Sequence, residues 1–339
     1  NSCYMNRMSL LQFYSLLEKN EDVVLTDDIY IRDSLRLIER FLLFLGVISL
    51  ERPVKFNKEF NGNGNTIYNL SNQFCKSVCK DGVIKNISIE SEKTFEQSVI
   101  CTENKGSIQN INLNVIIESN TGKLGSIAKS NTGVIQGCSF TGEIQHKSYD
   151  TGGIVIVNEN TITDCAVCAT ITGDCETGGI VSTNKNGTIE GCTVIGKTVI
   201  RGRTNTAGIA ALNTGTVIEC TISNVDIMTE TDRTDIYTFG GIVAVNNGSV
   251  ESCTCGDGVE IRGGEIVGGL VGENVNTVQN STVKSAVEVS GTEIVGGVIG
   301  DNSESSIVRN VIVQNCYVHG DKYIGGITGM SSSVHKQVI

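Results

Sequence analysis

Short runs of alternating apolar and polar residues recur along most of the chain, and Gly or Asn separates one run from the next. Residues 188–194, 198–200 and 208–212 are examples, each of strand length and mostly apolar or β-branched. A helical period is confined to residues 9–19, with Ser9 as N-cap and an apolar face of Leu10, Phe13 and Leu17 or Leu16. The pattern predicts an all-β chain that begins with a short helical cap.

Three ladders of residues repeat with one period of about 28 residues. The first is a Gly-Gly-aliphatic tripeptide, which starts at Gly152, Gly178, Gly240, Gly268, Gly296 and Gly325, with degenerate copies at Gly125 and Ala207. The second is a ladder of amides: Asn131, Asn158, Asn184, Asn213, Asn246, Asn274 and Asn302. The third is mostly thiols: Ile111, Cys138, Cys165, Cys192, Cys220, Cys253, Ser281 and Val311. A shared period in three ladders predicts a solenoid.

Each repeat has room for two or three short strands, with Asn and Gly at the corners because both residues tolerate positive φ. Stacking such coils in register makes parallel sheets, with strands about 4.8 Å apart. We therefore expect a right-handed parallel β-helix of about eight coils, its hand following the bias of parallel crossovers. The expected parts are a cap and leading segment at 1–55, the repeats at 56–330 and a tail at 331–339. The thiols should line the core, and the amides should bond from coil to coil.

Two of these motifs resemble the GLUG repeat, named for its Gly-Leu-aliphatic-Gly core. Residues 268–274 (GGLVGEN) match the motif, residues 296–302 (GGVIGDN) nearly match it, and most other copies lack its second glycine. The leading residues 25–31 (LTDDIYI) and 56–70 (FNKEFNGNGNTIYNL) resemble the segments that precede such repeats. The resemblance covers about residues 9–330. It implies a pectin-lyase-like β-helix that serves large surface or secreted proteins as a stalk, adhesin or accessory region.

Composition agrees with a core of small residues. The chain has 39 Gly, one Pro, no Trp and 5% aromatic residues, which suits stacked coils and excludes collagen. A net charge of −11 with scattered basic residues disfavours nucleic acid and anionic lipid as partners. The most apolar stretch, Ile38–Leu50, is shorter than the roughly 20 residues that span a bilayer, so we expect no transmembrane segment.

Thirteen cysteines are many for one chain. In-register stacking points the ladder thiols the same way, which is poor geometry for disulfides. Cys165 and Cys168 have the spacing of a zinc or redox motif, but an odd spacing on a strand sends them to opposite faces. Cys75 and Cys79 either form a local disulfide or stay free. Many unpaired thiols are typical of a reducing compartment.

One coil is longer than the rest, and its extra residues fall at about 228–238. Insertions in solenoids form loops on one face and often bind partners, so this is the candidate binding loop: Glu230, Asp232, Arg233, Asp235 and Tyr237. Its carboxylates lack the glycine and the spacing of a calcium loop, so we expect a solvated acidic loop and no metal.

Asn-x-Ser/Thr sequons occur at five positions. Asn186 and Asn247 lie in corner turns and are the candidate glycosylation sites, whereas Asn280 is expected to be partly buried. Beyond residue 329 no capping helix is evident, so we expect self-association or a partner at the C-terminal coil.

No catalytic centre or cofactor site is expected. The carboxylates near the thiol ladder (Asp164, Glu190, Glu219 and Glu251) alternate between one and two positions before the cysteine, so they do not align. The histidines (His146, His319 and His335) are far apart in the repeat.

The sequence favours a non-catalytic surface or extracellular module, structural or adhesive, that contacts a protein or glycan or mediates assembly. Two alternatives stay open: an intracellular scaffold component of a larger assembly, and a polysaccharide lyase or glycosidase.

Overall fold

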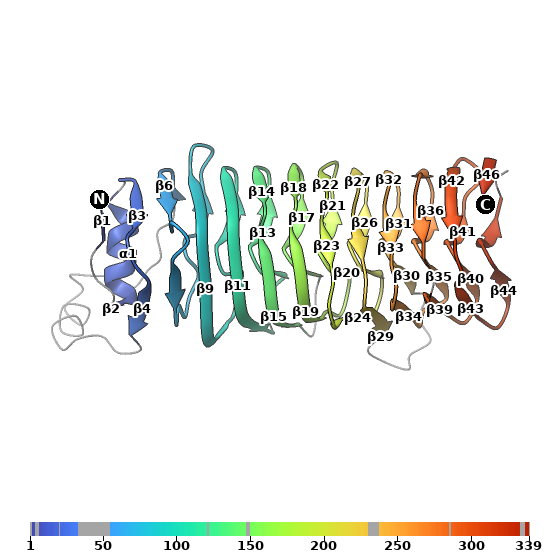
Figure 1. The fold of residues 1–339 in the computed structure, drawn as a ribbon, viewed down its shortest axis with the longest axis horizontal. Coiled ribbons are helices and arrows are strands. Elements are labelled where there is room, and N and C mark those ends of the chain that lie inside the picture. The colour runs from blue at the N-terminus through green and yellow to red at the C-terminus, as the bar shows by residue number, and fades with distance from the viewer. Residues whose placement is uncertain are drawn as a thin grey trace.

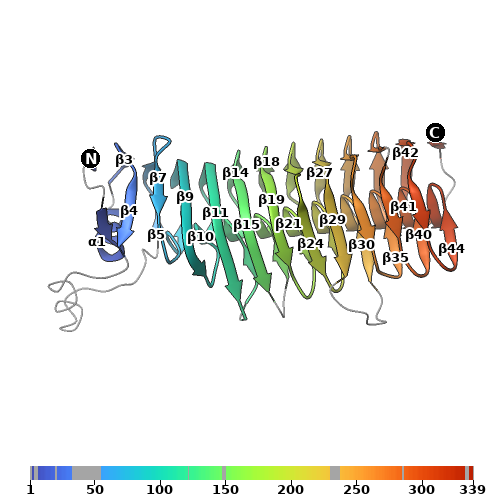
Figure 2. The same ribbon diagram turned by 60° about the horizontal axis from the view of Figure 1, so that its bottom comes forward.

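The chain folds as an elongated parallel β-solenoid (Figures 1 and 2). The computed structural model describes residues 2–3, 7–19, 21–32, 55–120, 122–146, 150–229, 237–284, 286–332 and 336–338. The apolar stretch 38–50 lies outside these residues. Every strand pairing recorded among the described residues is parallel, and each strand pairs with strands of the neighbouring coils. The expected all-β solenoid is confirmed.

Three sheets run along the rod. The 11-stranded sheet contains β5 (Lys55–Phe56), β8 (Ser77–Val78), β10 (Cys101–Asn104), β13 (Ala128–Asn131), β17 (Val155–Asn158), β21 (Val181–Asn184), β26 (Ala210–Asn213), β31 (Val243–Asn246), β36 (Val271–Asn274), β41 (Ile299–Asn302) and β45 (Thr328–Ser331). The 8-stranded sheet contains β12 (Leu124–Gly125), β16 (Thr151–Gly152), β20 (Thr177–Gly178), β25 (Thr206–Ala207), β30 (Thr238–Gly240), β35 (Ile266–Gly268), β40 (Ile294–Gly296) and β44 (Tyr323–Gly325).

The third sheet is the broadest and has 27 strands, because most coils contribute more than one strand to it. Its strands are β1 (Ser2–Cys3), β2 (Arg7–Ser9), β3 (Val23–Leu25), β4 (Ile29–Arg32), β6 (Glu59–Asn61), β7 (Thr66–Tyr68), β9 (Val83–Phe95), β11 (Ser107–Ser119), β14 (Val134–Gln136), β15 (Ser139–His146), β18 (Thr161–Thr163), β19 (Ala166–Thr172), β22 (Thr188–Glu190), β23 (Thr193–Val194), β24 (Thr198–Gly202), β27 (Thr216–Ile218), β28 (Thr221–Ile222), β29 (Val225–Thr229), β32 (Ser249–Glu251), β33 (Thr254–Cys255), β34 (Glu260–Arg262), β37 (Thr277–Gln279), β38 (Thr282–Val283), β39 (Glu288–Ser290), β42 (Ile307–Val313), β43 (Tyr317–His319) and β46 (Lys336–Val338).

The solenoid has about eleven turns, as the 11-stranded sheet shows, and not the eight expected. The count from sequence was low because it followed the Gly-Gly motif, which first appears in β12. The coils before β12 stack in the same parallel register, but they lack that motif. Periodicity of a motif therefore underestimated the length of the rod.

The core consists of columns of small aliphatic residues. One column runs Ile135, Ile162, Ile189, Val217, Val250, Val278 and Val308, and each of these side chains is at most 4% exposed. Each coil supplies one member, and the coils on either side complete its burial. Large aromatic rings are therefore unnecessary along most of the rod.

The N-terminal end is closed by α1 (Leu10–Glu18). Ser9 caps the helix, and the reciprocal hydrogen bonds with Gln12 form a capping box. Phe13 is fully buried, with its ring centroid 5.2 Å from that of Phe74 and 6.3 Å from that of Phe60. The helical cap expected from residues 9–19 is confirmed, and aromatic residues gather where it meets the first coils.

The last coil is more open than those before it. Ile324 is 50% exposed, whereas Val295, its neighbour in the same column, is fully buried. A Cβ built on Gly297 would meet the carbonyl oxygen of Gly326 at 2.2 Å, but one built on Gly326 would meet nothing within 4 Å.

Candidate functional site

The amide ladder is internal. The seven Asn residues of the ladder are fully buried, and the first six each donate from the side-chain amide to the side-chain oxygen of the Asn in the next coil at 2.8–2.9 Å. The last, Asn302, donates to the hydroxyl of Ser331 at 3.5 Å. Asn104, which the sequence analysis left out, begins the row with a bond of 2.7 Å to Asn131. Because these groups satisfy one another inside the rod, the ladder holds the coils in register and offers nothing to a ligand.

The thiol ladder is internal as well. Cys138, Cys165, Cys192, Cys220 and Cys253 are at most 1% exposed. Each of them donates from Sγ to the carbonyl oxygen two residues earlier, at 3.3–3.4 Å. All cysteines whose side chains the structure describes are free, including Cys75 and Cys79, and Cys168 is exposed on the opposite face from Cys165. Burial raises the pKa of the Cys138 thiol, which suits a core side chain and opposes reactivity.

Most of the candidate binding loop, namely Glu230, Asp232, Arg233 and Asp235, lies outside the described residues. Tyr237 is 4% exposed, and its carbonyl oxygen accepts hydrogen bonds from the amides of Glu265 and Ile266 at 2.9 and 3.0 Å. Tyr237 is therefore a buried core residue at the end of the candidate loop, and the loop stays a prediction.

The sequons Asn186 and Asn247 are exposed at corners of the rod. Asn280 is exposed too, contrary to expectation, because it occupies a corner with φ of 52° rather than a strand.

The corner position with positive φ, which Asn280 occupies in its coil, also explains why the carboxylates near the thiol ladder do not align. Asp164 and Glu219 occupy it with φ of 54°, whereas Glu190 and Glu251 lie one residue earlier on strands. The four carboxylates therefore belong to two separate columns and do not converge. His319 is exposed on β43, and His335 lies outside the described residues.

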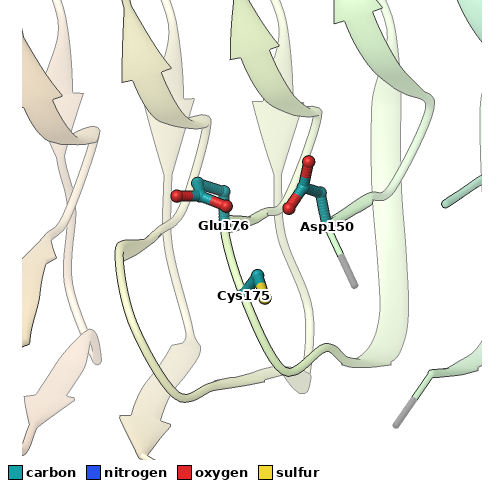
Figure 3. A group of neighbouring side chains, drawn as sticks. All are labelled: Asp150, Cys175 and Glu176. Atoms are coloured by element: carbon teal, nitrogen blue, oxygen red, sulfur yellow. The ribbon is translucent and has the colours of Figure 1, made fainter. Parts of the chain in front are cut away.

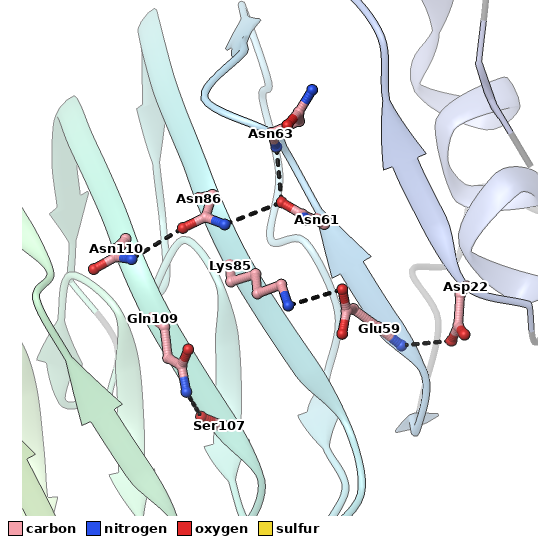
Figure 4. Close-up of polar contacts among 9 residues, drawn as sticks. All are labelled: Asp22, Glu59, Asn61, Asn63, Lys85, Asn86, Ser107, Gln109 and Asn110. Carbon is pink, nitrogen blue, oxygen red and sulfur yellow. Dashed lines mark hydrogen bonds and ion pairs between the residues drawn. The ribbon is translucent and has the colours of Figure 1, made fainter.

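Asn86 and Asn110 fill this corner in the first coils, and their amides form an outer row that ends on Asn61 of β6 (Figure 4). Asn110 donates to Asn86 at 2.9 Å, and Asn86 donates to Asn61 at 3.1 Å. On the adjoining strands Lys85 forms an ion pair with Glu59 at 2.9 Å. Sequence analysis missed this row, because Asn alternates with Gly, Asp and Glu at the corner in later coils.

The outer face of the 27-stranded sheet carries two columns of hydroxyl side chains, here called the hydroxyl columns. One contains Thr161, Thr188, Thr216, Ser249 and Thr277, and the other contains Ser139, Thr193, Thr221, Thr254 and Thr282. The second is interrupted once, by Ala166. All these hydroxyl residues are half-buried, so the columns form a shallow, regular surface.

A polar cleft of about 560 Å³ opens near the N-terminal end of the rod. Its lining includes Asn72, Gln73, Gln97, Lys123 and Lys129. Gln73 is fully buried and donates to the carbonyl oxygen of Ser98 at 2.9 Å, and Gln97 donates to Asn72 at 2.8 Å. Much of the polar lining is therefore already engaged within the protein.

Next to this cleft, one corner of the rod collects ionisable side chains, here called the corner cluster: Asp150, Cys175 and Glu176 (Figure 3). One carboxylate oxygen of each acid and the Cys175 sulfur all lie within 4.8 Å of one another, and all three residues are half-buried. Asp150 directly precedes β16, and Cys175 and Glu176 precede β20 in the next coil. The cluster escaped sequence analysis because its members are 25 and 26 residues apart and belong to no ladder.

Two basic residues described at this corner are each paired with an acid, one of which is Asp150 itself. Lys123 forms an ion pair with Asp150, and Arg203 forms one with Asp174 at 2.8 Å. Burial raises the pKa of Glu176, and a hydrogen bond with Asp150 raises it further. Burial also raises the pKa of Cys175, and the carboxylates of Glu176, Asp150 and Asp174 add to that effect. The corner therefore favours the protonated forms of Cys175 and Glu176.

His146 ends β15 at the same corner and is fully buried. Burial lowers the pKa of its imidazole, while a hydrogen bond with the backbone of Gly122 and the charges of Asp174 and Asp150 partly oppose that shift. The imidazole is therefore held mainly neutral and does not balance the acids beside it.

Comparisons with known proteins place the chain in no family. No model of a known family matches it, and no characterised protein matches it in sequence. Among solved structures, an IgA1 protease aligns with 94% of this chain at 14% sequence identity and a TM-score of 0.33. The chain spans 20% of that protein's length. The GLUG repeat stays a resemblance of motifs. No helix in the described part of the chain is long and apolar enough to cross a membrane.

Proposed function

We propose that the chain is a non-catalytic structural or adhesive module, of surface or extracellular type, that contacts a protein or a glycan. The observation that carries the proposal is the pair of hydroxyl columns on the 27-stranded sheet. They repeat one hydroxyl side chain per coil, at a spacing of about 4.8 Å, over five consecutive coils in one column and over six in the other, where Ala166 is the one interruption.

Hydroxyl groups both donate and accept hydrogen bonds, so these columns suit the amides of a protein or the hydroxyls of a glycan. Each contact is weak, but many of them on one rigid face add up when the partner is itself extended. The fully buried amide ladder keeps the coils in register and so keeps the face rigid.

The test is binding of the full chain to an array of immobilised polysaccharides and extracellular-matrix proteins. In the face variant, Thr193→Lys and Thr254→Lys place two long cations on one hydroxyl column. We expect affinity for the captured partner to fall by about tenfold or more. The matched control, Thr183→Lys with Val245→Lys, makes the same change on half-buried outer positions of the 11-stranded sheet and should bind normally. Absence of saturable binding by the unmodified chain, or equal loss in both variants, would contradict the proposal.

An intracellular scaffold is the second candidate, and the free thiols favour it. Intact mass after alkylation, with and without reduction, separates the two functions. Disulfides or glycan mass on Asn186 or Asn247 support the extracellular module, and unmodified thiols support the scaffold. A polysaccharide lyase or glycosidase has less support, because the carboxylates beside the thiol ladder fall in two columns.

Self-association at the C-terminal coil also belongs to this proposal. Tyr317, Tyr323 and Ile324 are each at least half exposed there, which is unusual for large apolar side chains in this rod. Sedimentation over a range of concentrations tests the idea, and a monomer at all concentrations would contradict it.

A further inference from the structure

Strand register explains why the members of the corner cluster meet. Leu124 pairs with Thr151, Thr151 with Thr177, and Thr177 with Thr206. The residues just before these strands therefore form a column of their own: Lys123, Asp150, Glu176 and Asn205. Two carboxylates are stacked in adjacent coils, and Cys175 adds a thiol beside them.

A cation would favour the ionised forms of both carboxylates, whereas without one the pKa of Glu176 is raised by burial and by its hydrogen bond with Asp150. Like charges in directly adjacent positions of a sheet repel, and partial burial strengthens the repulsion. Lys123 pairs with Asp150 on the far side from Glu176, and Arg203 is engaged by Asp174. The ion pairs recorded among the described residues include none to Glu176.

A second observation comes from the interior side of the corner. Among the described residues, the buried imidazole of His146 lies at this corner, and burial lowers its pKa. The described side chains of the corner therefore bring two carboxylates and a thiol around one point, and each of the three residues is partly exposed to solvent.

We propose that Asp150, Cys175 and Glu176 bind a divalent transition-metal ion of the Zn²⁺ type. A thiolate together with two carboxylates selects Zn²⁺, Co²⁺ or Cd²⁺ over Ca²⁺ and Mg²⁺, which prefer oxygen ligands alone. Three protein ligands leave a coordination position for water, or for the amide oxygen of Asn205 in the next coil. On binding, the Cys175 thiol releases its proton to solvent, as does Glu176 where it is protonated. This inference does not depend on the proposed function.

The experiment titrates the reduced, chelator-treated full chain with Co²⁺ alone. We expect one equivalent to bind, with a thiolate-to-cobalt charge-transfer band and with the visible absorption of a cobalt ion that has few ligands. Zn²⁺ should then displace the Co²⁺ and remove both signals. Cys175→Ser should abolish the charge-transfer band. Asp150→Asn and Glu176→Gln should each keep the band but weaken Co²⁺ binding by about tenfold or more.

The matched control is Cys168→Ser, which removes an exposed thiol from an outer strand position away from the cluster and should leave the titration unchanged. Circular dichroism of each variant shows that the solenoid has folded. The proposal is overturned if the unmodified chain gives no charge-transfer band, or if the band survives Cys175→Ser. It is also overturned if neither carboxylate variant weakens binding, because the metal would then be held by other groups.

Discussion

Removal of one amide from the middle of the buried ladder should destabilise the whole rod. Asn213 makes five hydrogen bonds: its oxygen accepts from Asn184 at 2.8 Å and from the amide of Gly215 at 3.2 Å, and its nitrogen donates to Asn246 at 2.8 Å and to the carbonyls of Gly215 and Ser249 at 3.3 Å. In Asn213→Ala all five are lost, with no room for bulk water because the site is fully buried.

The neighbouring amides keep some of their hydrogen bonds, which reduces the expected loss of stability. Asn184 still donates to the carbonyl of Gly187, and Asn246 still accepts from the amide of Gly248, so neither side chain is left without a partner. The amide of Gly215 does lose its recorded acceptor. Taking about 1 kcal/mol for each of two or three net bonds, and roughly 1–3 kcal/mol for an unsatisfied buried N–H, the expected cost is about 4 kcal/mol.

Urea unfolding followed by circular dichroism measures this cost, and the slope of the transition shows whether the same surface unfolds. Asn247→Ala is the matched control, because the same side chain is removed from an exposed corner and should change stability by less than about 0.5 kcal/mol. If Asn213→Ala costs less than about 1 kcal/mol, or no more than the control, the ladder does not hold the coils together as argued here.

Further perturbations follow from the structure. Gly241→Val should lower the free energy of unfolding by more than about 2 kcal/mol, because its Cβ would meet a backbone oxygen of the next coil at 2.1 Å. Gly326→Val should be nearly neutral, because a Cβ at that position meets no atom within 4 Å. Thermal unfolding of the two variants measures the difference. Alkylation of the native protein should modify the exposed Cys168 first. Burial raises the pKa of Cys316 from an ordinary 9.0 to about 11, so its alkylation rate should rise about tenfold per pH unit up to that value. Since the unfolded thiol loses its proton first, this group should lower stability as the pH rises from 9.0 to about 11, which pH-dependent unfolding measures. Ser9→Ala removes the helix cap and should cost about 1 kcal/mol in urea unfolding, and no change would mean that the capping box is dispensable.

The fold was predictable because the solenoid repeats one set of physical requirements at each coil. Gly must stand where the next coil's backbone oxygen comes within about 2 Å of a Cβ position, and Asn must stand where one amide can bond the next. Such requirements leave the same residue type in each coil, so a single chain displays them without relatives. The number of turns was not predictable in the same way. The coils of residues 55–120 satisfy the stacking with other side chains, such as Cys101 and Ile87, and without the Gly-Gly motif.

The corner cluster could not be predicted by the same reasoning. Its two carboxylates occupy a column that has no common residue type: Lys123, Asp150, Glu176, Asn205, Thr238, Ile266, Ile294 and Tyr323. A search for ladders discards such a column, because nothing in it repeats. Only the exact register, with Thr151 beside Thr177, places the two carboxylates against each other. A misalignment by a single residue would have separated them.

In a β-solenoid, therefore, the repeated columns carry stability and the unrepeated columns are free to carry chemistry. A coil whose inner Gly, Asn and aliphatic positions are kept stacks on its neighbours whatever its corner residues are. The corner column of this rod runs from a charged end, with Asp150 and Glu176, to an apolar end, with Ile294 and Tyr323, while the buried Asn column beside it stays constant. Where the ladders hold the coils in register, a column that breaks the repeat can bring side chains of different coils together. In this rod such a column places Asp150 against Glu176 with Cys175 beside them, and metal titration of that corner tests whether these side chains hold an ion.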